Sequence, residues 1–175
     1  TLNEHSFDGY NDMAGRALLE YDSGPLNVLV NLHGRRLRGS ARVFRGNSIK
    51  PGTNDFVDGF DVEHTAQNGA NPQRLNSWGT NVQASYAFDG LGTLFSITGW
   101  ERASVFSRGD VDGSYPAAVP FSVETGSSAK PREFTQEVRF ASEKFGDVSF
   151  QTGAYYFNQN LDTGASVSYT HLRAH

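Results

Sequence analysis

Apolar and polar residues alternate with a period of two along several stretches of this chain. Residues 77–89 show the pattern most clearly, and residues 26–36 and 134–141 repeat it. Successive side chains of a strand point to opposite faces, so each stretch predicts a β-strand with one apolar and one polar face. In the first stretch the apolar row is Trp78, Thr80, Val82, Ala84, Tyr86 and Phe88, and the polar row is Gly79, Asn81, Gln83, Ser85 and Ala87.

Three more stretches predict strands with a weaker alternation: residues 14–22, 93–106 and 148–158. A short helix is the alternative for 14–22. In 93–106, Phe95 and Ile97 fall on one side of the strand. The last stretch carries aromatic residues on both faces, and no helical period of useful length occurs elsewhere.

The connections fall into two classes. Residues 22–25, 89–92 and 144–147 contain Gly and predict tight turns that each close a hairpin. Residues 38–76 and 109–133 are long and polar, and every Pro lies in a turn or in one of these loops. The sequence therefore predicts an all-β, antiparallel up-and-down meander of about six long strands.

Strand length and aromatic placement indicate where such a sheet resides. Several predicted strands exceed ten residues, whereas strands of globular proteins usually have about 5–6 and tilted barrel strands need about 9–11. Outer-membrane barrels also pair short turns at one end with long loops at the other, and carry aromatic girdles. We therefore predict an open segment of a transmembrane β-barrel. The aromatic residues expected near strand ends or on apolar faces include Trp78, Tyr86, Phe95, Trp100, Phe134, Phe140, Tyr155 and Tyr156.

Composition removes several classes of function. The 175 residues contain no Cys, which excludes disulfides and thiol catalysis. The formal net charge of −4 gives no basic face for nucleic acid. A hydrophobic content of 37% is what strands with one apolar face and long polar loops would give.

Three motifs in this order resemble the strands of TonB-dependent outer-membrane receptors. Residues 92–100 read GTLFSITGW, residues 134–142 read FTQEVRFAS and residues 146–156 read GDVSFQTGAYY. The resemblance implies a 22-stranded barrel with a plugged lumen, of which about six strands are present here. The plug and the TonB-contacting segment of the family are absent, so we expect the chain to be an internal stretch of the barrel domain's sequence.

The same resemblance implies a role in transport. Such receptors take up a scarce nutrient, most commonly a ferric siderophore, across the outer membrane of a Gram-negative bacterium, driven by TonB. The implied partners are outer-membrane lipid, TonB through the missing N-terminal part, and the nutrient ligand. A passive porin-type barrel and a soluble β-sandwich binding module, such as a lectin, are the alternatives.

Both ends of the chain are expected to be cut. The chain starts at Thr1 without a signal-peptide pattern, and residues 167–175 resemble a translated sequencing adapter. We therefore assign residues 1–166 to a partial receptor barrel domain and residues 167–175 to a non-native tail, with a native polar C-terminal tail as the alternative for 167–175.

No catalytic, metal or cofactor motif is found, so we predict that the chain is not an enzyme and holds no cofactor. Residues 110–114 match part of a calcium loop, although a plain Asp-Gly turn is favoured. Residues 35–38 form a basic cluster that could meet anionic lipopolysaccharide, with a solvated face as the alternative. The long loops 38–76 and 109–133 are expected to contact substrate. Lumen-facing candidates for a substrate path, or for internal salt bridges, are Arg16, Glu20, Asn31, His33, Glu137 and Arg139.

Overall fold

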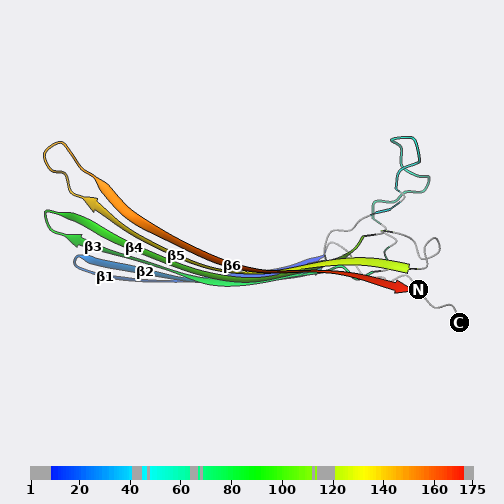
Figure 1. Ribbon diagram of the computed structural model, residues 1–175, viewed down its shortest axis with the longest axis horizontal. Coiled ribbons are helices and arrows are strands. Elements are labelled where there is room, and N and C mark those ends of the chain that lie inside the picture. Colours follow the sequence, from blue (N-terminus) through cyan, green and yellow to red (C-terminus); the bar gives the residue numbers. More distant parts are fainter. Residues whose placement is uncertain are drawn as a thin grey trace.

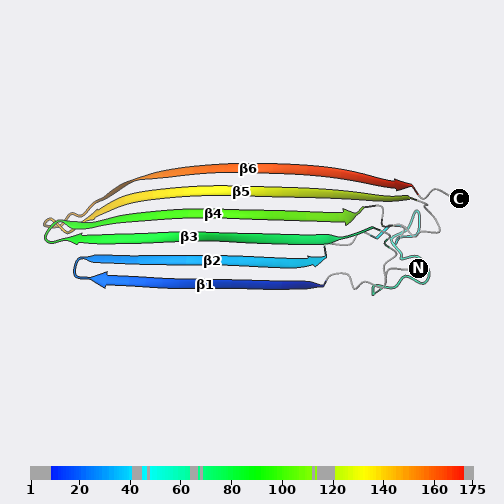
Figure 2. The same cartoon turned by 90° about the horizontal axis from the view of Figure 1, so that it is seen from below.

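The computed structural model describes residues 9–40, 45–46, 48–63, 67, 69–111, 113 and 121–171. Six strands form one antiparallel sheet in which every strand pairs with its neighbours in the chain (Figures 1 and 2). The sheet is open, because β1 and β6 pair on one side only. The strands are β1 (Tyr10–Ser23), β2 (Leu26–Ser40), β3 (Pro72–Phe88), β4 (Gly92–Asp110), β5 (Phe121–Ser142) and β6 (Gln151–His171).

This architecture confirms the predicted all-β meander of six long strands. The helical alternative for residues 14–22 is wrong, because β1 pairs with β2 along its whole length. Within the described ranges, no helix is long and apolar enough to cross a membrane. β6 includes residues 167–171, the first part of the segment assigned to a non-native tail, and that assignment stays a prediction.

The three short turns all lie at one end of the sheet, and both long connections leave from the other end (Figure 2). Gly24, Gly90 and Gly146 occupy the three turns with positive φ angles of 57°, 68° and 63°. Glycine adopts these angles without the steric cost of a Cβ atom. The predicted positions of the three hairpin turns are therefore confirmed.

The prediction of one long loop over residues 109–133 is wrong. β4 continues to Asp110 and β5 already begins at Phe121. Pro131 lies inside β5, where the β4–β5 ladder has no pairs between Arg102↔Arg132 and Val105↔Ala129. Pro has no N–H to donate, but the register is unchanged across the gap and β6 pairs with β5 on the other side. Hydrogen bonding to two neighbours thus maintains a strand whose own residues are mostly polar.

The registers define two faces of the sheet, since residues directly opposite each other point the same way. The apolar face carries alternate residues, including Leu19, Val30, Val82, Leu94, Trp100, Phe134, Val138 and Tyr156. The polar face carries the residues between them, including Arg16, His33, Asn81, Gln83, Glu101, Glu137 and Arg139. Phe95 corrects the sequence analysis, because it lies on the polar face beside Arg139. Tyr155 lies on the same face opposite Glu137, as expected for a stretch with aromatic residues on both faces.

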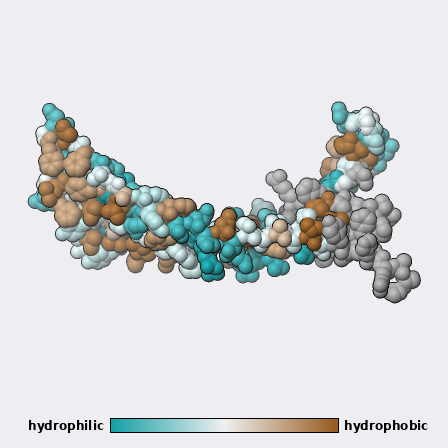
Figure 3. Space-filling view, in the orientation of Figure 1, coloured by the Kyte–Doolittle hydropathy of each residue, from teal (hydrophilic) through white to brown (hydrophobic). Residues whose placement is uncertain are grey.

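No second layer of described residues covers either face. Among the described residues, Asp110 is the one large side chain that is fully buried. Side chains of the apolar face are more than 40% exposed at Leu19, Trp78, Val138 and Tyr156. Apolar side chains gather toward the end with the short turns, at the left of Figure 3. A single sheet ordinarily buries its apolar face against another layer. The described residues of this sheet therefore leave its apolar face uncovered.

Candidate functional site

The six proposed lumen-facing residues share the polar face of the sheet. Arg16 and Glu20 stand on β1, Asn31 and His33 on β2, and Glu137 and Arg139 on β5. Glu20 and Glu137 lie at the same level but four strands apart, about 19 Å at ~4.8 Å per strand. The face therefore presents separate groups of these residues rather than one constellation.

The first group is built around Gly79 in the middle of β3. Gly79 lies directly between His33 on β2 and Glu101 on β4. His33 Nε2 contacts Glu101 Oε1 at 2.8 Å, across the backbone of the glycine. Arg16 pairs with His33 from β1 and adds a positive charge to the group. Any Cβ at position 79 would occupy the space of the Glu101 carboxylate, only 2.2 Å from Oε2.

We expect Gly79→Ala to separate His33 from Glu101 without unfolding the sheet. The added methyl group would displace the flexible end of Glu101 rather than backbone. The His33 and Glu101 side chains are 32% and 45% exposed, and pairs this exposed contribute at most about 1 kcal/mol. The His33 imidazole resonances report the loss of contact by NMR.

Gly15→Ala is the matched control, because a Cβ there meets nothing within 4 Å. It should leave the His33 resonances unchanged. An unchanged His33 environment in Gly79→Ala would contradict the arrangement described here.

The second group surrounds Arg139 on β5. Its guanidinium carbon lies 5.0 Å from the centre of the Phe95 ring, a cation–π distance. Its Nη1 is 3.6 Å from Glu137 Oε1. Arg139 and Glu137 also line a shallow depression with Gln151, Thr152, Gly153, Ala154 and Tyr155 of β6. Cationic, anionic and aromatic groups thus meet at one place on the polar face.

Three buried polar atoms of the described side chains have no hydrogen-bond partner. They are Asn31 Oδ1, His33 Nδ1 and Arg139 Nε. All three belong to proposed lumen-facing residues. Buried polar atoms ordinarily have a hydrogen-bond partner, so these three residues have unused hydrogen-bonding capacity on the polar face. Glu20 already accepts a 3.0 Å hydrogen bond from Asn27 Nδ2.

The basic cluster of residues 35–38 is partly engaged within the sheet. Arg35 donates from Nε and Nη2 to the Asp12 carboxylate at 2.9 and 2.6 Å. These hydrogen bonds, with the guanidinium charge, hold the pKa of Asp12 below its usual value. Arg38 donates to the carbonyls of Leu37 and Leu75 and to Asn76. Two of the cluster's arginines therefore stabilise the loop ends of β1–β3.

Asp110 of the partial calcium motif binds backbone N–H groups in the described residues. Asp110 accepts hydrogen bonds from the N–H groups of Gly69 and Gly113, at 2.9 and 3.3 Å. Asp112 lies outside the described residues. No group of three potential metal-ligating side chains occurs in the part of the chain that the structure describes. Asp110 therefore binds backbone N–H groups, and the Asp-Gly turn stays a prediction.

The apolar face carries two aromatic rows at different heights. One crosses β3–β6, where the ring centres of Trp78 and Trp100 are 4.4 Å apart and those of Phe134 and Tyr156 are 6.3 Å apart. The other lies near the short turns and consists of Tyr86, Phe88, Phe140 and Phe150, with ring centres 4.7 and 6.1 Å apart within each pair. We call these the Trp row and the Tyr–Phe row.

The polar side chains between the two rows bond to one another. Gln136 interrupts the apolar residues of β5, as the sequence analysis noted. Its Oε1 accepts a 2.6 Å hydrogen bond from Thr98, and its Nε2 donates to Ser96 at 3.1 Å. Both hydroxyls come from β4 on the same face. These hydrogen bonds reduce the free-energy cost of removing the three polar side chains from water.

Sequence reasoning missed Gly79, Glu101 and the role of Phe95. The alternation of β3 did place Gly79 in its polar row. No single-strand pattern shows that Glu101 lies over it, because that position depends on the β3–β4 register.

Fold and surface together define an all-β protein made of one open antiparallel meander, with a polar and an apolar face. Comparison of the chain with protein-family models, curated proteins and solved structures gave no match.

Proposed function

We propose that this chain forms part of the wall of an outer-membrane β-barrel of the TonB-dependent receptor kind. Its role would be energised uptake of a scarce nutrient, such as a ferric siderophore. The observation that carries the proposal is the uncovered apolar face between the Trp row and the Tyr–Phe row. A lipid-facing barrel wall has such an apolar band, flanked by aromatic girdles.

The spacing of the two rows supports a bilayer as the apolar environment. On β3, Trp78 is eight residues from Tyr86 and ten from Phe88, and on β5 Phe134 is six residues from Phe140, which gives about 20–33 Å along a strand. At a strand tilt of about 35–45°, the band would be about 14–27 Å tall, a range that includes the ~25 Å of known barrels. A second sheet, as in a soluble sandwich, would not require aromatic rows at two fixed heights.

The assignment to the TonB-dependent receptor kind rests on three motifs that resemble strands of that family. They fall on consecutive paired strands: residues 92–100 in β4, 134–142 in β5 and 146–156 in the last turn and β6. The short turns and long loops at opposite ends match the periplasmic and extracellular ends of such barrels. On this proposal the polar face lines the lumen, and the loop end would contact the nutrient.

Flotation with phospholipid vesicles tests the membrane proposal. We expect the chain to aggregate in water, because the sheet has two unpaired edge strands and an exposed apolar face. Folded from denaturant in the presence of vesicles, it should float with the lipid and resist carbonate extraction. A monodisperse monomer that melts cooperatively in water and does not float would contradict the proposal.

A further inference from the structure

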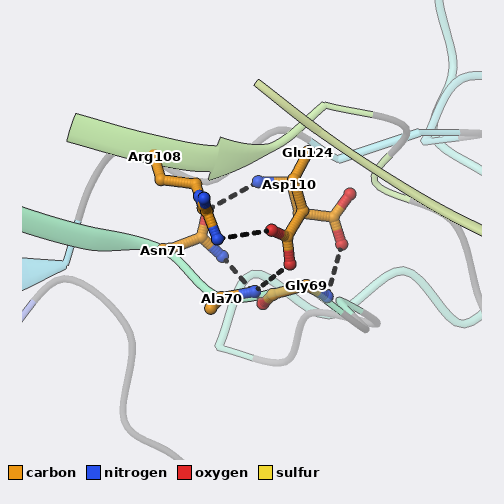
Figure 4. Close-up of polar contacts among 6 residues, drawn as sticks. All are labelled: Gly69, Ala70, Asn71, Arg108, Asp110 and Glu124. Atoms are coloured by element: carbon orange, nitrogen blue, oxygen red, sulfur yellow. Dashed lines mark hydrogen bonds and ion pairs between the residues drawn. The ribbon is translucent and has the colours of Figure 1, made fainter. Parts of the chain in front are cut away.

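Buried polar side chains gather at the loop end of the sheet. Among the described residues the buried polar or charged side chains are Gln67, Asn71 and Asp110, with 7%, 7% and 0% exposure. Asn71 and Asp110 lie where the β2–β3 loop returns to the sheet, at the end of β4 (Figure 4), and Gln67 accepts a hydrogen bond from Asn71. Elsewhere the sheet has polar groups on its open faces. This cluster is thus the most enclosed part of the described chain.

The β2–β3 loop projects from this end as an arm, which we define as residues 48–63 (Figure 1). The arm has its own structure: Lys50 N–H donates to Asp55 O at 2.9 Å and Val57 N–H to Ser48 O at 3.0 Å. Phe56 also stacks on another arm residue, Phe60, at a ring distance of 4.3 Å. Two legs connect the arm to the sheet. The β2 leg is described at residues 45–46, and the β3 leg at residues 67 and 69–71.

Asp110 holds the leg that leads to β3. Its Oδ2 accepts the N–H of Gly69 at 2.9 Å, and its own N–H donates to Asn71 Oδ1 at 2.9 Å. Asn71 Nδ2 in turn donates to Gln67 Oε1 and to the carbonyl of Gly69. Both the backbone and the side chain of Asp110 thus bind this leg.

The same aspartate reaches the other leg through Gly113. Oδ1 of Asp110 accepts the N–H of Gly113 at 3.3 Å, and the carbonyl of Gly113 accepts the N–H of Gly46 at 3.2 Å. Gly46 precedes the arm on the β2 side. One carboxylate therefore connects both legs to the end of β4.

Glu124 on β5 adds a second carboxylate to the β3 leg. It accepts the N–H of Ala70 at 3.0 Å and pairs with Arg108 Nη1 at 3.3 Å. Arg108 stands on β4 directly opposite Gly126, two residues from Glu124. The leg is thereby attached to two neighbouring strands.

We propose that Asp110 and Glu124 form a latch that holds both legs of the arm against β4 and β5, so that the arm keeps one position relative to the sheet. A carboxylate suits the role of Asp110, because its two oxygens accept N–H groups from two different segments. An amide has one acceptor oxygen and would direct an NH₂ group at the other donor. The latch concerns the loop end alone and does not depend on a membrane around the sheet.

Hydrogen exchange of the chain in detergent micelles, followed residue by residue by NMR, tests the latch. In Asp110→Asn one of the two amides, Gly69 or Gly113, faces the NH₂ group, and we expect it to exchange about tenfold faster or more from the loss of one buried hydrogen bond. The mid-strand amides of Val82 and Ile97 should keep their protection.

Asp58→Asn is the matched control. It removes the same charge from the arm itself, where Asp58 is exposed and pairs with Lys50 at 2.7 Å. It should leave exchange at Gly69 and Gly113 within about twofold of the parent chain. Equal exchange in the parent, Asp110→Asn and Asp58→Asn would overturn the latch.

Glu124→Gln is a second test of the latch, to be used if Asp110→Asn also unfolds the strands. It should accelerate exchange at Ala70 while leaving Gly113 protected, because Gly113 bonds to Asp110 alone of the two carboxylates. Unchanged exchange at Ala70 would contradict the latch. If the parent chain failed to float with vesicles, only the membrane proposal would be contradicted. The latch is tested separately, by comparing the exchange of loop amides with that of strand amides in one sample.

Discussion

Gly92→Ala is expected to destabilise the sheet by about 2–6 kcal/mol. Gly92 begins β4 with φ at +139°, and a Cβ there would lie 2.2 Å from Ala141 O and 2.7 Å from Ser142 Cα. The strained backbone costs about 1–3 kcal/mol and the overlap with backbone atoms about 1–3 kcal/mol more. The clash cannot be relieved by a side-chain movement, so the first β4–β5 pairs must separate. Urea unfolding in micelles, followed by the fluorescence of Trp78 and Trp100, measures the loss.

Gly90→Ala separates strain from overlap. Gly90 also has a positive φ, +68°, but a Cβ there meets nothing within 4 Å. We expect a cost of only about 1–2 kcal/mol, from the left-handed conformation alone. Equal losses for the two substitutions would show that Gly92 does not approach β5 as described.

Val82→Arg is expected to cost about 2–4 kcal/mol when the chain is embedded in a bilayer. Val82 lies on the apolar face, four residues from Trp78 and four from Tyr86. It is therefore midway between the two aromatic rows, where a lipid-facing Arg is most unfavourable. Urea unfolding from phospholipid vesicles measures the difference from the parent chain.

Gln83→Arg is the matched control for this prediction. It introduces the same side chain one residue away, on the polar face, opposite Leu29 and Ile97. We expect a change within about 0.5 kcal/mol, as for a surface substitution. If Gln83→Arg were the more damaging of the two, the apolar face would not be the one that meets lipid.

Strand existence and hairpin turns could be predicted from the sequence because both are local. Alternation within one strand identified residues 77–89, and Gly identified the turns at Gly24 and Gly90. Strand ends could not be predicted in the same way. β5 begins thirteen residues before the predicted Phe134, since its first half is polar and is maintained by pairing with β4 and β6.

The candidate site was predictable only in part, for a related reason. Alternation placed Arg16, His33 and Arg139 on polar rows of their own strands, and the registers bring these rows onto one face. The contact of His33 with Glu101 across Gly79 involves three strands. No pattern within a single strand contains that information.

The sequence by itself determined the number of strands, their order and the turns between them, because each depends on neighbouring residues. The tertiary structure decided which rows share a face, and so moved Phe95 to the side of Arg139. It also decided that Asp110, which the sequence marks only as a turn residue, is buried, binds one leg of a distant loop at Gly69 and reaches the other leg through Gly113. These features depend on register and loop closure, which bring together residues some 40 positions apart in the chain.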